Sequence, residues 1–230
     1  MIFFVINKFQ IMMSNNSNTK IIVAIDGPSA SGKGTVAKKI ADHFNIAYLN
    51  TGALYRAVAL QMQEKQIAVE DLDKFLPEIA LKLQYKDLEN PKLFLENCGQ
   101  LASKIAQNPR VRNDLLVYQK NFVKQNSLGC VLDGRDTTTV ICPEANFKFF
   151  ITADVEIRAK RRYLQLKDSS PLIDYSQILQ QLKERDANDL NRKFSPLKIA
   201  DDAIFIDNGD LTIVQTFDII LKHINLKISK

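Results

Sequence analysis

The feature that most constrains the fold of this chain is a glycine-containing loop at residues 27–35, which lies between an apolar run and a helical pattern. Residues 21–25 are apolar without a break and mostly β-branched, which is typical of a central strand buried on both faces. After the loop, apolar side chains recur at helical spacing, at Val36, Ala37, Ile40 and Phe44. The chain is therefore predicted to open with a strand, a loop and a helix.

The loop itself has the pattern G-x-x-x-x-G-K, with the hydroxyl residue one place later than usual. Its residues are Gly27, Pro28, Ser29, Ala30, Ser31, Gly32, Lys33, Gly34 and Thr35. The glycines allow successive N–H groups to point at one centre, which also receives the positive end of the helix. We expect Lys33 to reach the β- and γ-phosphates of a nucleotide, and Thr35 to offer a hydroxyl to Mg²⁺. The alternative is an ordinary turn of small residues, which the flanking strand and helix disfavour.

Strands and helices alternate along the rest of the chain, which predicts an α/β fold with a parallel sheet and helices on both faces. Buried strands are expected at residues 130–132, 147–151 and 203–206. Helices are expected at residues 54–63, 71–83, 109–122, 154–164, 175–190 and 212–223. The region between residues 51 and 128 has no clear core strand, so it is interpreted as an excursion from the sheet. Within it, a small hairpin is expected around residues 81–95.

Size and composition fit one globular domain, since the 230 residues are 46% hydrophobic and 25% charged. No apolar run approaches the roughly 20 residues that span a bilayer, so no membrane partner is expected. The net charge of +5 suits binding of phosphates or of nucleic acid and does not decide between them. Three cysteines without a CxxC pair indicate reduced thiols in a cytoplasmic protein. Residues 1–19 are predicted to form a disordered extension.

A hydroxyl residue and an arginine lie at the start of the second predicted helix. This helix is expected to begin near Ala53, with Thr51 and Gly52 as its cap. Arg56 comes about one turn later, so it can face the same pocket as the Thr51 hydroxyl, and the two groups suit an anionic acceptor. Taken alone, the segment could equally be a capped helix with a surface arginine.

Charged residues also follow the strand predicted at residues 130–132, at the edge where ligands bind in open α/β sheets. Arg135 is placed to grip a phosphate, and Asp136 is placed to accept hydrogen bonds from ribose hydroxyls. Asp133 has the position of a Walker B carboxylate, which would hold Mg²⁺ through water. The alternative for this segment is a simple polar turn.

The last third of the chain supplies an excess of basic residues. Residues 158–193 contain nine basic and five acidic residues, and Arg185, Asp189 and Arg192 are spaced to share one helix face. This pattern indicates a cationic lid over phosphates, with residues 167–171 as its mobile tip. Two solvated helices with internal ion pairs are the alternative.

Five sequence blocks, taken in order, resemble those of the bacterial cytidylate kinases: IDGPSASGKGT, TGALYR, NPRVR, LDGRDTTTV and KERDANDLNR. The resemblance runs from about residue 21 to the C-terminus. It implies a P-loop kinase core, an inserted acceptor-binding domain and a short lid. It also implies in-line transfer of the ATP γ-phosphate to CMP or dCMP, assisted by Mg²⁺ in a closed, arginine-rich site.

The resemblance assigns roles to particular residues. The implied contacts to the acceptor nucleotide are Thr51, Arg56, Ser103, Arg112, Arg135, Asp136, Arg185, Asp189 and Arg192. Within this set, Ser103 and Arg112 are the implied readers of cytosine, and Asp189 would orient the arginines around it. Lys33 would neutralise migrating charge together with four arginines of the lid region: Arg158, Arg162, Arg185 and Arg192.

The chain departs from the family pattern in three places. Asn50 stands where an acidic residue is expected, and Thr138 stands where glycine is expected. The stretch between the expected hairpin and Ser103 is also shorter, which bears most directly on the assignment of Ser103.

The resemblance predicts one P-loop kinase domain at residues 20–230. Its parts would be a core at 20–50, 129–157 and 199–230, an acceptor insert at 51–128 and a lid at 158–195. The expected partners are ATP, CMP and dCMP, with no nucleic acid, and the protein is expected to be a monomer. The alternatives are a small P-loop kinase for UMP, dTMP or AMP, and a non-catalytic nucleotide-gated nucleic-acid binder. The second lacks support, because the arginines do not form an aromatic-interleaved stripe.

Overall fold

The structure is a computed structural model, and it describes residues 20–168 and 173–229. The extension expected at residues 1–19 and most of the lid tip expected at residues 167–171 lie outside the described residues.

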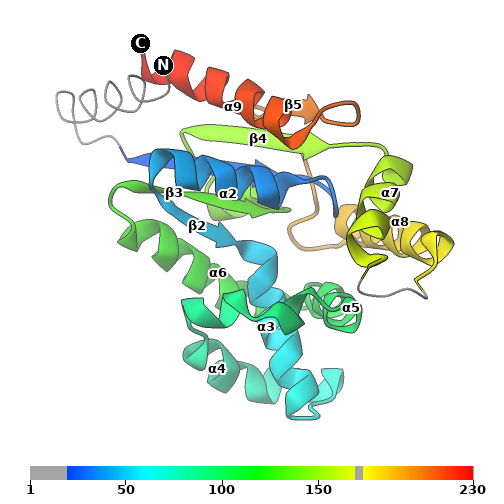
Figure 1. The fold of residues 1–230 in the computed structure, drawn as a ribbon. Helices are drawn as coiled ribbons and strands as arrows, with labels where there is room; N and C mark the ends of the chain where they lie inside the picture. The colour runs from blue at the N-terminus through cyan, green and yellow to red at the C-terminus, as the bar shows by residue number, and fades with distance from the viewer. Residues whose placement is uncertain (1–19, 169–172, 230) are drawn as a thin grey trace.

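Five parallel strands form one sheet, in the order β2-β3-β1-β4-β5 (Figure 1). The strands are β1 (Ile21–Asp26), β2 (Ala47–Asn50), β3 (Gly129–Gly134), β4 (Phe147–Thr152) and β5 (Ile204–Asp207). All four strand pairs are parallel, which confirms the predicted sheet. β1 lies at the centre, and its last residue, Asp26, is in register with Gly134 of β3 and Phe150 of β4. The carboxyl ends of the strands therefore meet at one edge.

Helices cover both faces of the sheet. α2 (Lys33–Phe44) and α9 (Ile213–Ile228) pack on one face, and the segment from α3 to α6 packs on the other (Figure 1). Alternate residues of β1 serve the two cores: Val23 and Ile25 face α2 and α9, and Ala24 faces the opposite side. This alternation explains why the strand reads as a continuous apolar run.

The excursion from the sheet is helical throughout. It comprises α3 (Thr51–Glu64), η1 (Val69–Asp71), α4 (Leu72–Lys82), η2 (Tyr85–Glu89), η3 (Pro91–Phe94), α5 (Glu96–Ile105) and α6 (Pro109–Gln125). The helix expected to begin near Ala53 begins two residues earlier. Its cap is Asn50, whose side chain accepts a hydrogen bond from the Ala53 backbone N–H at 3.0 Å, and not Thr51 with Gly52.

The hairpin expected around residues 81–95 is wrong, because two 3₁₀ helices occupy most of this segment. Asn90 caps the second of them by accepting a hydrogen bond from the Lys92 N–H, and Pro91 fills its first position. Proline has no N–H for a strand ladder and has a φ suited to a helix start, so the local chemistry favours a helical turn.

The remaining elements belong to the carboxyl edge and to the region in which a lid is expected. η4 (Thr137–Ile141) is a π-helical turn directly after β3, and α7 (Val155–Leu166) and α8 (Tyr175–Asn191) pack together through a small cluster around Ala159. Among the helices of residues 20–168 and 173–229, none is long and apolar enough to cross a membrane.

Candidate active site

The phosphate loop curls around the start of α2. Gly27 has a φ of 151°, and a Cβ there would collide with the carbonyl oxygen of Ile151, so only glycine fits. Gly32, with a φ of 82°, caps α2 in the left-handed region. Lys33 is buried and reaches across the loop, where its Nζ donates to the Pro28 carbonyl at 3.0 Å. The loop thus holds its lysine inward, as a phosphate-binding loop requires.

Lys33 loses its proton more readily here than a lysine in water does. Burial lowers the pKa of Lys33 to about 7, and the nearby Arg135 acts in the same direction, whereas Asp133 opposes the change. A nearby anion favours the protonated form of such a group, so Lys33 can take up a proton and become positively charged when an anion binds. The lysine is therefore suited to a polyphosphate ligand.

The two expected Mg²⁺ ligands differ in their surroundings. Asp133 is buried at the end of β3 and accepts a hydrogen bond from the Tyr48 hydroxyl at 2.6 Å. Burial raises the pKa of Asp133, and Lys33 and Tyr48 act in the opposite direction. Gly34 faces this carboxylate, since a Cβ there would lie 3.6 Å from Asp133 Oδ2. Thr35, the next residue, is exposed on the helix surface.

This donor set fits a metal that arrives with its own phosphate ligands. In the part of the chain that the structure describes, no group of three or more His, Cys, Asp or Glu residues could hold a metal ion. Mg²⁺ at nucleotide sites commonly uses one or two carboxylates together with substrate phosphates and water. Asp133 suits such a role. The exposed hydroxyl of Thr35 lines a pocket with Gly34 and Tyr48 and stays an expected ligand.

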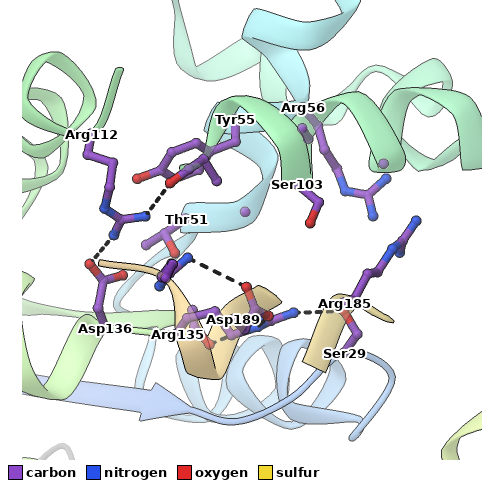
Figure 2. A pocket seen from close by; sticks show the side chains of 16 residues that line it. Ser29, Thr51, Tyr55, Arg56, Ser103, Arg112, Arg135, Asp136, Arg185 and Asp189 are labelled. Atoms are coloured by element: carbon purple, nitrogen blue, oxygen red, sulfur yellow. Dashed lines mark hydrogen bonds and ion pairs between the residues drawn. The ribbon is translucent and has the colours of Figure 1, made fainter. Parts of the chain in front are cut away.

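All nine acceptor residues implied by the resemblance line one pocket, hereafter the acceptor pocket (Figure 2). They are Thr51, Arg56, Ser103, Arg112, Arg135, Asp136, Arg185, Asp189 and Arg192. These residues come from α3, α5, α6, the turn after β3, and the end of α8. Ser29 of the phosphate loop also lines the pocket, so the two sites adjoin.

One end of the acceptor pocket carries a buried ion pair. Arg112 of α6 contacts Asp136, and both side chains are 8% exposed (Figure 2). The Arg112 guanidinium also lies over the Tyr55 ring, 5.6 Å from its centroid. Ser103 projects from α5 on the facing wall. A planar donor, an acceptor and an aromatic ring at this end, with a hydroxyl on the facing wall, suit the edge of a nucleobase.

A second group of charges lies beside the phosphate loop. Arg135 pairs with Asp189 at 2.6 Å and donates to the Ser29 hydroxyl at 2.8 Å. Asp189 also contacts Arg192 at 3.5 Å, so one carboxylate orients two arginines. Thr51 donates its hydroxyl to the Asp133 carbonyl at 2.8 Å, which joins the start of α3 to β3.

Arg56 and Arg185 converge at Gly99 of α5. A Cβ at this glycine would lie 2.8 Å from Arg56 Nη1 and 3.0 Å from Arg185 Nη2. Burial lowers the pKa of Arg56 to about 10, and the neighbouring Arg185 contributes. Two guanidiniums held this close create a site for an anion.

Buried donors around the acceptor pocket indicate a ligand that accepts hydrogen bonds. Nε of Arg112 and Nη2 of Arg192 are buried, and among the described residues neither has a hydrogen-bond partner. Buried polar atoms in folded proteins nearly always have partners. A nucleotide, with phosphate and carbonyl oxygens, would supply them.

The other two arginines expected to be catalytic lie outside the acceptor pocket. Arg158 pairs with Asp186 at 2.6 Å and donates to the Ser29 carbonyl at 3.1 Å, so it links the phosphate loop to α8. Arg162 lies 3.7 Å from Glu96, which also pairs with Arg185. Sequence reasoning missed Asp186 and Glu96, and it also missed Tyr55 and Tyr48.

The model of the cytidylate kinase family matches residues 23–226. The chain belongs to this family. The cytidylate kinase of Bartonella henselae is 44% identical over 198 residues, which are 86% of this chain and 91% of the relative. That of Brucella suis is 42% identical over 85% of this chain and 89% of the relative. A crystal structure of an uncharacterized protein from Eubacterium ventriosum has a similar fold, with a TM-score of 0.51 at 19% identity, and it covers 90% of this chain and 99% of that chain.

Two departures from the cytidylate kinase pattern have structural partners here. Asn50, in place of an acid, caps α3 through its side chain. Thr138, in place of glycine, is buried and donates both its N–H and its hydroxyl to Asp26. The shortened stretch between the expected hairpin and Ser103 is the first part of α5 (Glu96–Ile105), and Ser103 still reaches the acceptor pocket.

Proposed function

We propose that this protein transfers the γ-phosphate of ATP to CMP or dCMP. The observation that carries the proposal is the acceptor pocket, where all nine implied acceptor residues meet beside Ser29 of the phosphate loop. Membership of the cytidylate kinase family supports the same reaction.

The chemistry proposed here depends on alignment and charge. A phosphate oxygen of the acceptor is already ionised at neutral pH, so the site needs no strong general base. Lys33, Arg135 and Arg185 would hold the two phosphates in line and balance the charge that moves between them. Mg²⁺, held near Asp133 through water, would supply further neutralisation of the ATP phosphates.

Movement of two segments would complete the site. We assign residues 51–128 as the acceptor-binding insert and residues 158–195 as the lid, on the core at 20–50, 129–157 and 199–230. Closure of these segments would exclude water and limit ATP hydrolysis. The contacts of Arg162 and Arg185 with Glu96 support a lid that meets the insert.

The choice of base is assigned to the far end of the acceptor pocket. Ser103, Arg112 and Asp136 present a hydroxyl, a guanidinium and a carboxylate within a confined space. A cytosine offers an amino donor and two acceptors. Uracil reverses two of these groups, because it has a carbonyl oxygen in place of the amino group and an N–H at N3. A site built for one pattern leaves buried groups unpaired with the other, which costs affinity.

The first test is ADP formation by purified protein with ATP and Mg²⁺, across CMP, dCMP, UMP, dTMP, AMP and GMP. Turnover confined to CMP and dCMP is the expected result. Preference for UMP, dTMP or AMP would retain the phosphate-loop chemistry and overturn Ser103 and Arg112 as base readers. ATP binding without any turnover, together with salt-sensitive nucleic-acid binding, would favour the non-catalytic alternative.

We also propose that the protein is a monomer in the cytoplasm. All nine implied acceptor residues of a single chain line the acceptor pocket, which supports a monomer. Cys98, Cys130 and Cys142 are free and buried, which supports a reducing cytoplasmic location.

A further inference from the structure

A buried carboxylate joins the two loops that line the active site. Asp26, the last residue of β1, is fully buried and directly precedes the phosphate loop. Its Oδ1 accepts from the Thr137 N–H at 2.8 Å and the Thr137 hydroxyl at 2.7 Å. Its Oδ2 accepts from the Thr138 N–H at 2.8 Å and the Thr138 hydroxyl at 2.6 Å. Each carboxylate oxygen therefore holds one threonine.

Four donors around one group suit the ionised carboxylate. The backbone N–H groups can only donate, and both threonine hydroxyls are within donating distance of a carboxylate oxygen. Burial raises the pKa of Asp26, and the bonds from Thr138 and Thr137 act in the opposite direction. The four bonds offset part of the desolvation cost of this buried group.

Asp26, the β1 partner in this junction, is held in place by the strands on both sides of β1. β1 is the central strand, and Asp26 is in register with Gly134 of β3 and Phe150 of β4. The next residue, Gly27, has no space for a side chain against Ile151. Asp26 is thus anchored from both neighbouring strands.

The other side carries acceptor-binding residues. The turn after β3 presents Arg135 and Asp136 to the acceptor pocket, and Thr137 follows Asp136 directly. The Asp136 carbonyl accepts from the N–H groups of Val140 and Ile141, at 2.9 and 3.1 Å, within the π-helical turn η4. Such turns occur often at functional sites. These bonds fix the inside of the turn, whereas the bonds from Thr137 and Thr138 to Asp26 tie the turn to β1.

We propose that Asp26 is a positioning residue that holds the 134–138 turn at a set distance from the phosphate loop, so that Arg135 and Asp136 meet the acceptor nucleotide in register with ATP. The inference rests on the proposed function. Thr138 strengthens the junction in this chain, because the glycine of the family pattern would offer Asp26 only an N–H.

The test removes the hydroxyls and keeps the backbone donors. In Thr137→Val/Thr138→Val, Asp26 loses two of its four bonds while the side chains keep their shape. We expect kcat/KM for CMP to fall about 10-fold to 100-fold, since a misplacement of about 1 Å can cost 10²-fold. The Kd for ATP, titrated without acceptor, should stay within about twofold, because the anchored phosphate loop does not depend on the turn. The single variant Thr138→Ser keeps both hydroxyls and should retain most of the wild-type activity with CMP.

The matched control is Thr216→Val in α9. Thr216 is also fully buried and donates its hydroxyl to the Thr212 carbonyl at 2.9 Å, a bond that stays at the start of α9 and reaches neither the phosphate loop nor the turn after β3. It should lower the Tm and leave the kinetic constants for CMP unchanged.

Three outcomes would overturn the inference. Kinetic constants for CMP within twofold of wild type, with a Tm lowered as in Thr216→Val, would show that Asp26 only stabilises the fold. A loss of ATP affinity as large as the loss in kcat/KM for CMP would show that it holds the phosphate loop instead. A wild-type protein that does not phosphorylate CMP in the same assay would overturn the proposed function and the inference with it.

Discussion

At the scale of single residues, Lys33 links the active site to pH. Its pKa of about 7 results first from burial and then from Arg135, while Asp133 and Asp189 act in the other direction. ATP phosphates placed beside Lys33 would favour the charged form and raise this pKa. Binding of ATP above pH 7 must therefore recruit a proton, whereas below pH 7 the lysine is already charged.

The sign of this linkage gives a prediction. The Kd for ATP should rise as pH increases above about 7, by up to about tenfold per pH unit. ATP itself contributes little there, since the second pKa of a phosphate is about 6. Calorimetry at pH 8 in buffers of different ionisation enthalpy should show proton uptake by the wild type. Equal uptake by Lys33→Met would assign the proton to another group.

Gly99 provides a second prediction at this scale. In Gly99→Ala the added methyl group meets the guanidiniums of Arg56 and Arg185, which are flexible ends, so the fold should persist. Their displacement should raise KM for CMP by about tenfold, the loss of about one charge-assisted hydrogen bond. Steady-state kinetics would measure this, with Gln100→Ala on the exposed side of the same helix as control. Similar kinetics in both variants would contradict the proposed convergence of arginines.

At the scale of elements, the strands buried on both faces were predictable because they are short apolar runs. β1, β3 and β4 have this pattern. β5 was found from its apolar residues, but it is an edge strand with mixed burial and not the buried strand expected there. β2 lacks the pattern, since Ala47–Asn50 is a four-residue edge strand with mixed burial. The alternating leucines around residues 81–95 imitated a hairpin, although caps at Gln84 and Asn90 favour helical turns there. α5 was missed because it contains Gly99 and many polar residues.

The composition of the acceptor pocket was predictable from sequence blocks, but the pairing of its charges was not. Glu96 contacts Arg185 across 89 positions, and Asp186 contacts Arg158 across 28. No local pattern encodes such distant partners, because they depend on how helices pack in three dimensions. The junction at Asp26 joins residues 111 and 112 positions apart and was invisible for the same reason.

The cap of α3 gives a prediction at the scale of an element. Asn50→Ala removes the acceptor for the Ala53 N–H, and loss of such a cap costs about 1 kcal/mol. Denaturant unfolding should show this loss, with Asn50→Asp within a few tenths of the wild-type value. Equal stability of Asn50→Ala and wild type would mean that packing alone fixes the start of α3.

At the scale of the whole molecule, the proposed insert and the proposed lid meet at one carboxylate. Glu96 of α5 contacts Arg185 of α8 and Arg162 of α7, and Arg56 lies beside Arg185. Two arginines thus share one partly exposed acid, and a third lies beside them. The net positive charge at this contact is available to an anionic ligand.

Removal of that acid should strengthen binding of phosphate-bearing ligands. In Glu96→Gln the Kd for CMP should fall by roughly fivefold, which is about 1 kcal/mol for a partly exposed pair. The Kd for cytidine, which lacks the phosphate, should not change. Titration calorimetry would measure both, with the exposed Glu89→Gln on the same insert as control. Weaker binding of CMP by Glu96→Gln would mean that Glu96 mainly orients Arg185.

The whole insert is a single connection between neighbouring strands. It leaves β2 after Asn50 and returns at the start of β3, and the two strands pair in register, with Asn50 opposite Asp133. Lengthening a connection of this kind costs little, about 0.6 kcal/mol for each doubling of a flexible loop. Evolution can therefore shorten, extend or exchange this segment while the phosphate loop stays in place. New acceptor preferences can arise on an unchanged sheet by replacement of one contiguous stretch of gene.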